Sequence, residues 1–540
     1  MTVLGTTIDA NIASGDMSDQ GGAGIFNAGG TLMIADSTII SNNICDGLAG
    51  SGGGILNDAG GILTIENTTI SGNVSIRAGG GIEDNSGDAS LVVLTNVLLE
   101  ANTTGGSPGN GGAVHITGNG DIQINGSWVI QNQADAEGGG LWNGTGTMTV
   151  LGTTIDANIA SGDMADQGGA GIFNAGGTLM IADSTIISNN ICDGLAGSGG
   201  GILNDAGGIL TIENTTISGN VSIRAGGGIE DNSGDASLVV LTNVLLEANT
   251  TGGSPGNGGA VHITGNGDIQ INGSWVIQNQ ADAEGGGLWN GTGTMTVLGT
   301  TIDANIASGD MSDQGGAGIF NAGGTLMIAD STIISNNICD GLAGSGGGIL
   351  NDAGGILTIE NTTISGNVSI RAGGGIEDNS GDASLVVLTN VLLEANTTGG
   401  SPGNGGAVHI TGNGDIQING SWVIQNQADA EGGGLWNGTG TMTVLGTTID
   451  ANIASGDMSD QGGAGIFNAG GTLMIADSTI ISNNICDGSA GSGGGILNDA
   501  GGTLTIENTT ISGNVSVRAG GGIEDNSGRR IARRAHKRIA

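Results

Sequence analysis

The side chains that could carry chemistry recur at a fixed position in a repeated pattern. The residue that follows an aliphatic residue in five consecutive sequence units reads Phe26, Leu56, Glu83, His115 and Trp142. An exposed Trp beside His and Glu could stack on a sugar ring and hydrogen-bond its hydroxyl groups. The alternative is ordinary lateral stacking, by which like side chains on neighbouring strands stabilise a sheet. The candidate glycan-contact stripe consists of Phe26, Glu83, His115, Trp142, Trp289 and Trp436.

These residues do not form a recognisable catalytic cluster. Glycoside hydrolysis needs two carboxylates that face one substrate. Glu83 and Asp84 are adjacent, so on a strand they project to opposite sides. Arg77 and its three copies are the only Lys or Arg residues before residue 529, too few to grip an acidic polysaccharide. We therefore predict no catalytic residues, and a polysaccharide-cleaving activity is the alternative.

Paired Thr residues also project from the expected strands. Thr6-Thr7 and Thr68-Thr69 resemble the rows of an ice-binding surface, but Leu98 and Trp128 interrupt the column. We discard ice binding for this reason.

Acidic loops raise the question of a cation site. Asp16, Asp19, Asp46, Asp135 and Glu137 offer the oxygen ligands that Ca²⁺ prefers. The EF-hand pattern and the nonapeptide calcium-binding repeat are both missing, and acidic loops also keep a long stack soluble. We expect no cofactor and no metal site, with calcium as the alternative.

The elements that position these residues follow from a long internal repeat. The first 147 residues recur from Met148, from Met295 and, shortened, from Met442. Each block divides into five units of roughly 26 to 31 residues, which is the length of one turn in a stacked solenoid. Apolar residues two apart in each unit, such as Leu63 and Ile65, predict short strands.

One Asn recurs in every unit, and aliphatic residues stand three, eight and ten positions before it. The residues three positions before it are Ile8, Ile39, Ile70, Leu99 and Val129, and those eight positions before it are Val3, Ile34, Ile65, Leu94 and Ile124. A turn-forming Asn can bond its own backbone and pass an amide hydrogen bond to the Asn of the next turn. The predicted structural ladder contains Asn11, Asn42, Asn73, Asn102, Asn132, Asn158, Asn189 and Asn220. Counted through the whole chain, this column predicts eighteen turns.

A chain of short strands that returns to the same place about every 30 residues is a coiled ribbon with parallel strand pairing. One turn buries too few aliphatic side chains to offset the entropy of ordering its backbone, so neighbouring turns must complete its ladders and its core. We predict an all-β fold, a parallel β-helix solenoid of about 18 coils over residues 1–528, built from 147-residue blocks of five coils. Residues 529–540 are a basic tail, expected to be disordered or the remnant of a frameshift or truncation.

Composition and charge limit the partners. The chain contains 115 Gly among 540 residues, and four Arg against 51 acidic residues give residues 1–528 a formal charge of −47. Such a body repels nucleic acid. No apolar run of about 18 residues predicts a transmembrane segment. The four Cys are one position copied every 147 residues, which predicts free thiols rather than a disulfide framework.

The repeated motifs resemble those of a known group of proteins. Gly79-Gly80-Gly81-Ile82, Gly111-Gly112-Ala113-Val114 and Ile70-Ser71-Gly72-Asn73 are similar to the GGAI-type and FxxN-type repeats of polymorphic outer membrane proteins. More broadly they resemble pectate-lyase-like β-helices and autotransporter passenger domains. The chain departs from the family by using Ile, Leu or Val where the FxxN repeat has Phe.

This resemblance implies a right-handed coil in a secreted or cell-surface bacterial protein. We expect a structural or adhesive rod within a larger protein, with carbohydrate binding or polysaccharide degradation as the alternative. Its expected partners are surface glycans or proteins of a host or cell wall. Strand ends without a neighbouring turn also invite end-to-end self-association.

Overall fold

The protein is all-β, as predicted. The computed structural model describes residues 1–15, 21–87, 90–106, 108–162, 167–234, 237–309, 314–342, 344–381, 384–400, 402–456 and 461–528. Asp16, Asp19 and the basic tail 529–540 lie outside these residues. The chain divides into two compact units, Met1–Gln270 and Ile271–Ala540.

Each turn consists of four short strands, named here first to fourth by their order in the turn. The strands of the first block are β1 (Thr2–Leu4), β2 (Thr7–Asp9), β3 (Ile12–Ala13), β4 (Ile25–Ala28), β5 (Thr31–Ala35), β6 (Ile39–Ser41), β7 (Ile44–Cys45), β8 (Ile55–Asp58), β9 (Ile62–Glu66), β10 (Thr69–Ser71), β11 (Val74–Ser75), β12 (Ile82–Asn85), β13 (Leu91–Thr95), β14 (Leu98–Glu100), β15 (Thr103–Thr104), β16 (Val114–Ile116), β17 (Asp121–Asn125), β18 (Trp128–Ile130), β19 (Gln133–Ala134) and β20 (Leu141–Asn143). The pattern continues to β36 (Val261–Ile263) in the first unit and from β38 (Trp275–Ile277) to β72 (Ile523–Asp525) in the second. Over the described residues the first, second, third and fourth strands each number 18. Together they form a solenoid of about 17 turns.

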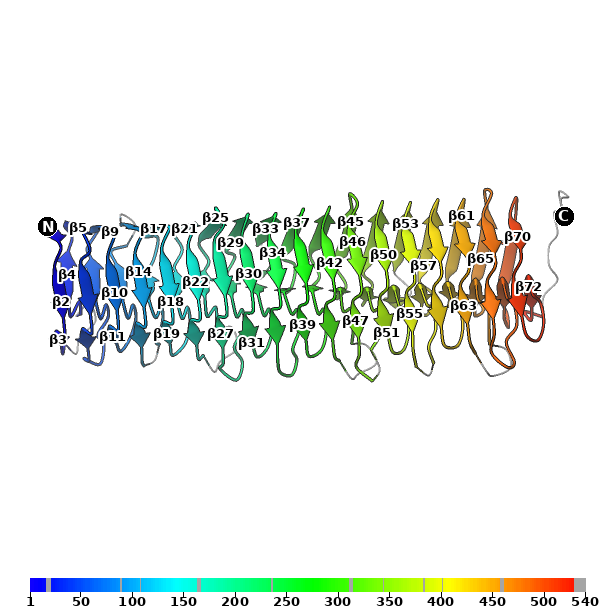
Figure 1. Ribbon diagram of the computed structural model, residues 1–540, viewed down its shortest axis with the longest axis horizontal. Coiled ribbons are helices and arrows are strands. Elements are labelled where there is room, and N and C mark those ends of the chain that lie inside the picture. Colours follow the sequence, from blue (N-terminus) through cyan, green and yellow to red (C-terminus); the bar gives the residue numbers. More distant parts are fainter. Residues whose placement is uncertain are drawn as a thin grey trace. The chain divides into compact units, whose positions relative to one another are not determined.

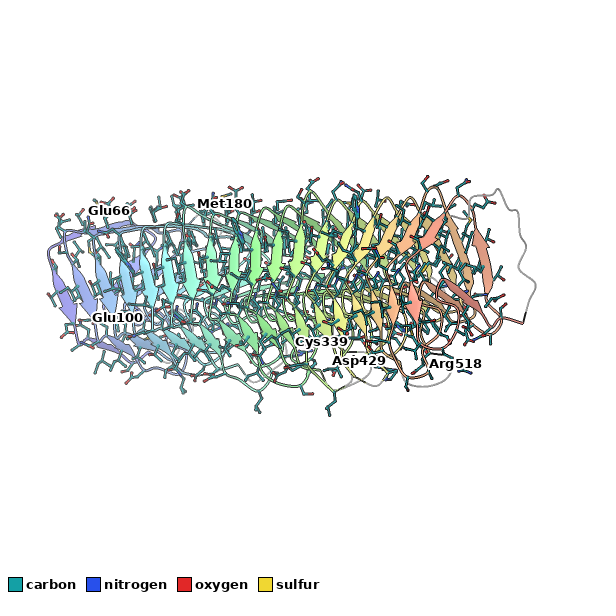
Figure 2. All side chains as sticks on the ribbon, turned by 45° about the vertical axis from the view of Figure 1, so that its right-hand side comes forward. Glu66, Glu100, Met180, Cys339, Asp429 and Arg518 are labelled. Carbon is teal, nitrogen blue, oxygen red and sulfur yellow. The ribbon has the colours of Figure 1, made fainter. Side chains whose placement is uncertain are left out.

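Within each unit, strands pair in parallel with their equivalents in the next turn. Figure 1 shows β10, β14 and β18 side by side as second strands of successive turns. Inward side chains form continuous aliphatic columns, because like residues face like residues in register. The column Val3, Ile34, Ile65, Leu94 and Ile124 is confirmed in the pairing of the first strands. Outward side chains such as Met180, on β25 (Thr178–Ala182), project from the surface (Figure 2).

The column of the second strands differs from the predicted one by a single residue. Ile40, and not Ile39, faces Ile8 and Ile70; Ile40 is fully buried and Ile39 is 41% exposed. The turn before β6 contains an extra residue, and both Asp36 and Ser37 adopt a left-handed conformation there. The extra residue is absorbed in the turn, which moves the inward position of β6 forward by one.

The same shift corrects the asparagine ladder at two positions. In each turn the ladder Asn donates from its side-chain nitrogen to the Oδ1 atom of the next ladder Asn, at 2.7–3.0 Å. In the two longer turns the members are Asn43 and Asn190, where Asn42 and Asn189 were predicted. Asn42 instead lies in a left-handed turn and donates to Asp9. The observed ladder is Asn11, Asn43, Asn73, Asn102, Asn132, Asn158, Asn190, Asn220 and Asn249.

The corner before each fourth strand requires a glycine at one position. Gly199 has φ +62°, and a Cβ atom placed there would lie 2.5 Å from the carbonyl oxygen of Ile202. Backbone conformation and close approach both exclude a side chain. This corner aims the fourth strand, which carries the predicted stripe.

None of the four cysteines forms a disulfide, as predicted, and all four are buried. In the first unit Cys192 packs with Ala160 and Ala170, and burial raises the pKa of its thiol to about 12. No helix in the described part of the chain is long and apolar enough to cross a membrane.

Candidate binding site

The predicted stripe is one column on the outer side of the fourth strands. Leu56 on β8, Glu83 on β12, His115 on β16 and Trp142 on β20 are direct neighbours in register. The next member is Phe173 on β24 (Ile172–Ala175). The five-residue pattern therefore lies side by side in space, as the repeat predicts.

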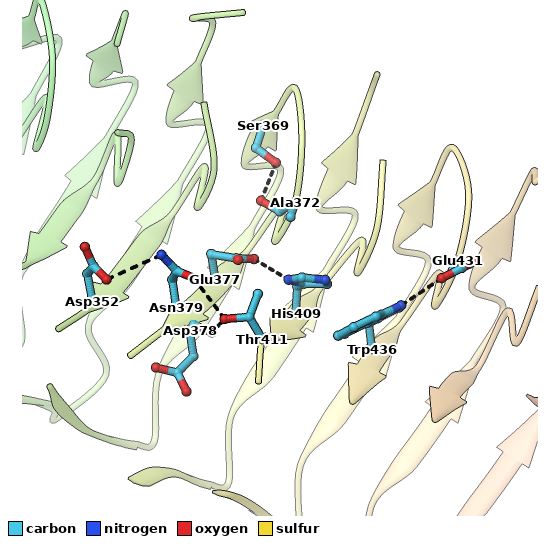
Figure 3. A network of polar contacts seen from close by, with 10 residues as sticks. All are labelled: Asp352, Ser369, Ala372, Glu377, Asp378, Asn379, His409, Thr411, Glu431 and Trp436. Atoms are coloured by element: carbon cyan, nitrogen blue, oxygen red, sulfur yellow. Dashed lines mark hydrogen bonds and ion pairs between the residues drawn. The ribbon is translucent and has the colours of Figure 1, made fainter. Parts of the chain in front are cut away.

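Glu83 and His115 form a buried pair. Their Oε2 and Nδ1 atoms are 2.8 Å apart, and the two residues are only 4% and 7% exposed. The pair recurs as Glu230 with His262 in the first unit. It recurs in the second as Glu377 on β52 (Ile376–Asn379) with His409 on β56 (Val408–Ile410), as Figure 3 shows.

The Trp of the stripe is held on three sides. The ring of Trp142 lies 4.2 Å from that of His115, at 31°, and stacks on Phe173 at 6.0 Å. Its Nε1 donates to Glu137 Oε2 at 3.0 Å. Burial raises the pKa of the Glu137 carboxyl, and the hydrogen bond from Trp142 opposes that rise.

The copies in the second unit keep this arrangement. Trp436, on β60 (Leu435–Asn437), donates to Glu431, and burial likewise raises the pKa of the Glu431 carboxyl (Figure 3). Trp289 donates to Glu284 and stacks on Phe320. Phe26 is 51% exposed, whereas its copies Phe173, Phe320 and Phe467 are buried.

A small pocket lies beside the stripe. In the first unit it has a volume of about 230 Å³, and its lining includes Arg77, Glu83, Asn85, His115 and Trp142. In the second unit the equivalent pocket, beside Arg371, Glu377 and His409, holds only about 70 Å³. Both are smaller than ordinary ligand pockets. Because Glu83 and His115 are buried, a ligand reaches them only through this small space.

The pocket lacks the carboxylate pair that hydrolysis needs. Asp84 points away from Glu83 into the interior, where its Oδ1 accepts from Asn57 at 2.8 Å and from Ser86 at 2.6 Å. The adjacent carboxylates thus lie on opposite sides of β12. Glu83 with His115 supplies an acid–base pair, but only one carboxylate faces the pocket.

The acidic loops do not converge in the described residues. No group of three or more His, Cys, Asp or Glu side chains there could hold a metal ion. Glu137, one of the calcium candidates, instead accepts the Trp142 hydrogen bond.

No protein-family model matches this chain, and no curated protein matches it either.

A second polar ladder inside the fourth strands was missed in the sequence. Asn27 donates to Asn57 at 2.6 Å, and Asn57 donates to Asp84 at 2.8 Å. The next series runs through Asn143, Asn174, Asn204 and Asp231. The sequence contained a signal for this second ladder. In most turns an Asn or Asp stands two positions after the inward aliphatic residue of the fourth strand.

The exposed tryptophan was also missed. Trp128, on β18, is 45% exposed, and it ends a groove of about 540 Å³ on the face of the second strands. We call this the Trp128 groove. Its lining residues are Asp36, Ser37, Ile39, Asn67, Thr68, Thr69, Asn96, Leu98 and Trp128. Leu98 and Trp128 are the residues that interrupt the Thr column in the sequence, and that interruption was the available signal.

Proposed function

We propose that the chain is a structural or adhesive rod and part of a larger secreted or cell-surface bacterial protein. One observation carries the proposal: the interior is closed by its own side chains, while each full block presents the same outward residues again. Asparagine ladders and aliphatic columns fill the inside of the turns.

The glycine-rich corners and parallel turns support the resemblance to polymorphic outer membrane proteins, pectate-lyase-like β-helices and autotransporter passengers. That resemblance is the basis for proposing a right-handed coil and a place outside the cell. A polysaccharide-cleaving function is less well supported, because only one carboxylate faces the stripe pocket.

Block number is the natural variable with which to test the proposal. Deleting residues 148–294 removes five turns and keeps the register, since Met295 continues the chain as Met148 did. The largest dimension from small-angle scattering should fall by about 24 Å. Beads coated with the full chain should be retained on cell-surface material, and the shorter chain should be retained less.

An out-of-register deletion is the control. Removing residues 172–186, about half a turn, should lower the unfolding temperature instead of shortening the particle cleanly. If the largest dimension is the same with and without the deleted block, the rod is contradicted. If no chain retains beads, the adhesive role is contradicted.

A further inference from the structure

We propose that the Trp128 groove binds a neutral, hydroxyl-rich polysaccharide strand. This inference names the ligand class of the adhesive function proposed above and rests on that function for its biological role. The binding itself is argued from the groove alone.

The groove crosses four successive turns. It runs from Asp36 and Ile39, beside β6, past β10 and β14 to Trp128 on β18. With a strand spacing of about 4.8 Å, this distance is about 14 Å along the stack. A groove of this length suits an extended chain better than a compact small molecule.

Its floor and one end are apolar and accessible. Trp128 is 45% exposed and Ile39 is 41% exposed, with the partly buried Leu98 as the direct neighbour of Trp128 in register. An indole face left in water is a large apolar surface with a defined plane. The C–H face of a pyranose ring matches such a plane, and its hydroxyl groups extend beyond it.

Amide groups stand at the edge of the same groove. Asn96 donates to Asn67 Oδ1 at 2.6 Å, and both residues hold a left-handed backbone that fixes the turn. That bond uses one of the two N–H groups of Asn96 and one lone pair of Asn67. The remaining amide capacity, with the carboxylate of Asp36, can donate to and accept from sugar hydroxyl groups.

The charge of the groove selects against acidic polymers. Asp36 is the one charged residue among its lining residues, and the surrounding body has a formal charge of −47. A polyuronate or a nucleic acid would meet repulsion with no cation to offset it. A neutral glycan has no such penalty.

The arrangement recurs in the second unit. Asn390 donates to Asn361 at 2.6 Å, and Trp422 is 45% exposed. Trp275, also 45% exposed, precedes Trp422 by five turns, or about 24 Å. A polymer that contacts both exposed indole rings gains avidity over a short oligosaccharide.

The experiment uses the full chain and three neutral probes, cellohexaose, laminarihexaose and mannohexaose, with polygalacturonate as the acidic comparison. Tryptophan fluorescence is titrated with each probe, and retardation on the corresponding polymers is measured by affinity electrophoresis. At least one neutral probe should shift the emission, and polygalacturonate should not.

Two sets of variants localise the binding. Replacing Trp128, Trp275 and Trp422 by Ala should weaken affinity more than 10-fold. The matched control replaces Met180, Met327 and Met474, which are exposed outside both the groove and the stripe, by Thr, the residue found one turn later at Thr211, and should keep wild-type affinity.

A third variant tests the amides without disturbing the fold. Asn96→Gly, with Asn243→Gly and Asn390→Gly, reproduces Gly126, which holds the same left-handed backbone one turn later, and should weaken binding several-fold. Absence of binding by all neutral probes, equal loss in the groove variant and the Met control variant, or preference for polygalacturonate would overturn the proposal. Each of these results would leave the scattering test of the rod unaffected, so the two proposals fail separately.

Discussion

At the scale of single residues, the ladder asparagines do the most to hold one turn on the next. Asn190 donates to Asn220 Oδ1 at 2.9 Å and to the carbonyl oxygen of Ile155 at 3.1 Å. Its own Oδ1 accepts from the backbone and side-chain nitrogens of Asn158. One buried side chain therefore satisfies polar groups in three turns, which is why the position is so demanding.

Asn190→Ala should lower the free energy of unfolding by about 3–5 kcal/mol, because it leaves several buried polar groups without partners. The adjacent change Asn189→Ala is the control. Ala157 and Ala248 occupy the equivalent left-handed position, so that variant should lie within about 1 kcal/mol of wild type. Urea unfolding of both variants measures the difference, and equal effects would contradict the ladder assignment.

A buried carboxyl makes stability depend on pH. Burial raises the pKa of Asp231, while hydrogen bonds from Ser233, Ser237 and Asn204 oppose the rise. Since the folded pKa lies above the ordinary aspartate value of 3.8, the contribution of Asp231 to stability is fully present below that pH. It is lost as pH rises through the folded pKa.

Asp231→Asn should remove this loss. The variant should therefore unfold at a higher temperature than wild type at pH 8, and its gain over wild type should be smaller at pH 4. Asn204 occupies the same position one turn earlier, so the amide fits. Asp9→Asn is the comparison variant. Hydrogen bonds from Ser41 and Asn42 lower the pKa of Asp9, so its effect on the pH dependence of stability should have the opposite sign. Thermal unfolding across pH 3–9 checks both, and an unchanged pH profile for Asp231→Asn would refute the assignment.

At the scale of elements, turns absorb irregularity and strands do not. Inward and outward positions alternate along a strand, so a shift of one residue inside a strand would expose its aliphatic column. The longer turns instead place two consecutive residues, Asp36 and Ser37, in the left-handed region. Strand β6 then resumes with Ile40 in the core.

Corner glycines should be the least replaceable residues of the turns. Gly199→Ala combines a left-handed backbone with a 2.5 Å contact to a carbonyl oxygen, and should reduce stability by about 3 kcal/mol. Gly252 has open space around its Cβ position and no left-handed φ, so Gly252→Ala should change stability by less than about 0.5 kcal/mol. Chemical denaturation distinguishes them, and a harmless Gly199→Ala would contradict the close approach at the corner.

At the scale of the whole molecule, stability comes from repetition, and the residues of a turn that has a neighbour on one side only are less well covered. Leu4 is 49% exposed and Ile12 is 66% exposed, although later copies of the same positions are better covered. Strand β1 pairs with β5 and presents its other edge outward. A parallel edge of this kind templates further pairing.

We predict that the isolated chain associates end to end when salt of about 0.5 M screens its negative charge. Thr2→Lys with Ile12→Lys should suppress this association, because Lys on an edge strand opposes pairing. Gln123→Lys with Gln133→Lys, exposed within the stack, is the control and should still associate. Sedimentation velocity over a concentration series gives the result, and a single monomer peak for the unmodified chain at high salt would rule it out.

Much of the fold was predictable because the repeat places like residues on like residues. The 147-residue period, the strand alternation and the columns through Ile65 and Ile82 follow from spacing alone. Spacing did not predict whether Ile39 or Ile40 faces the core, nor whether Asn42 or Asn43 joins the ladder. The reason is that spacing does not show whether an extra residue is accommodated before or after a strand.

The sequence by itself determined that this chain coils into parallel turns, since stacked turns bury aliphatic residues that recur every two positions and every 26 to 31 residues. Only the tertiary structure decided which tryptophan meets the solvent. Trp142 is covered by His115, Phe173 and Glu137, whereas Trp128 stays exposed above the groove. The physical reason is that exposure depends on side chains contributed by the turns above and below, which a single turn of sequence does not contain.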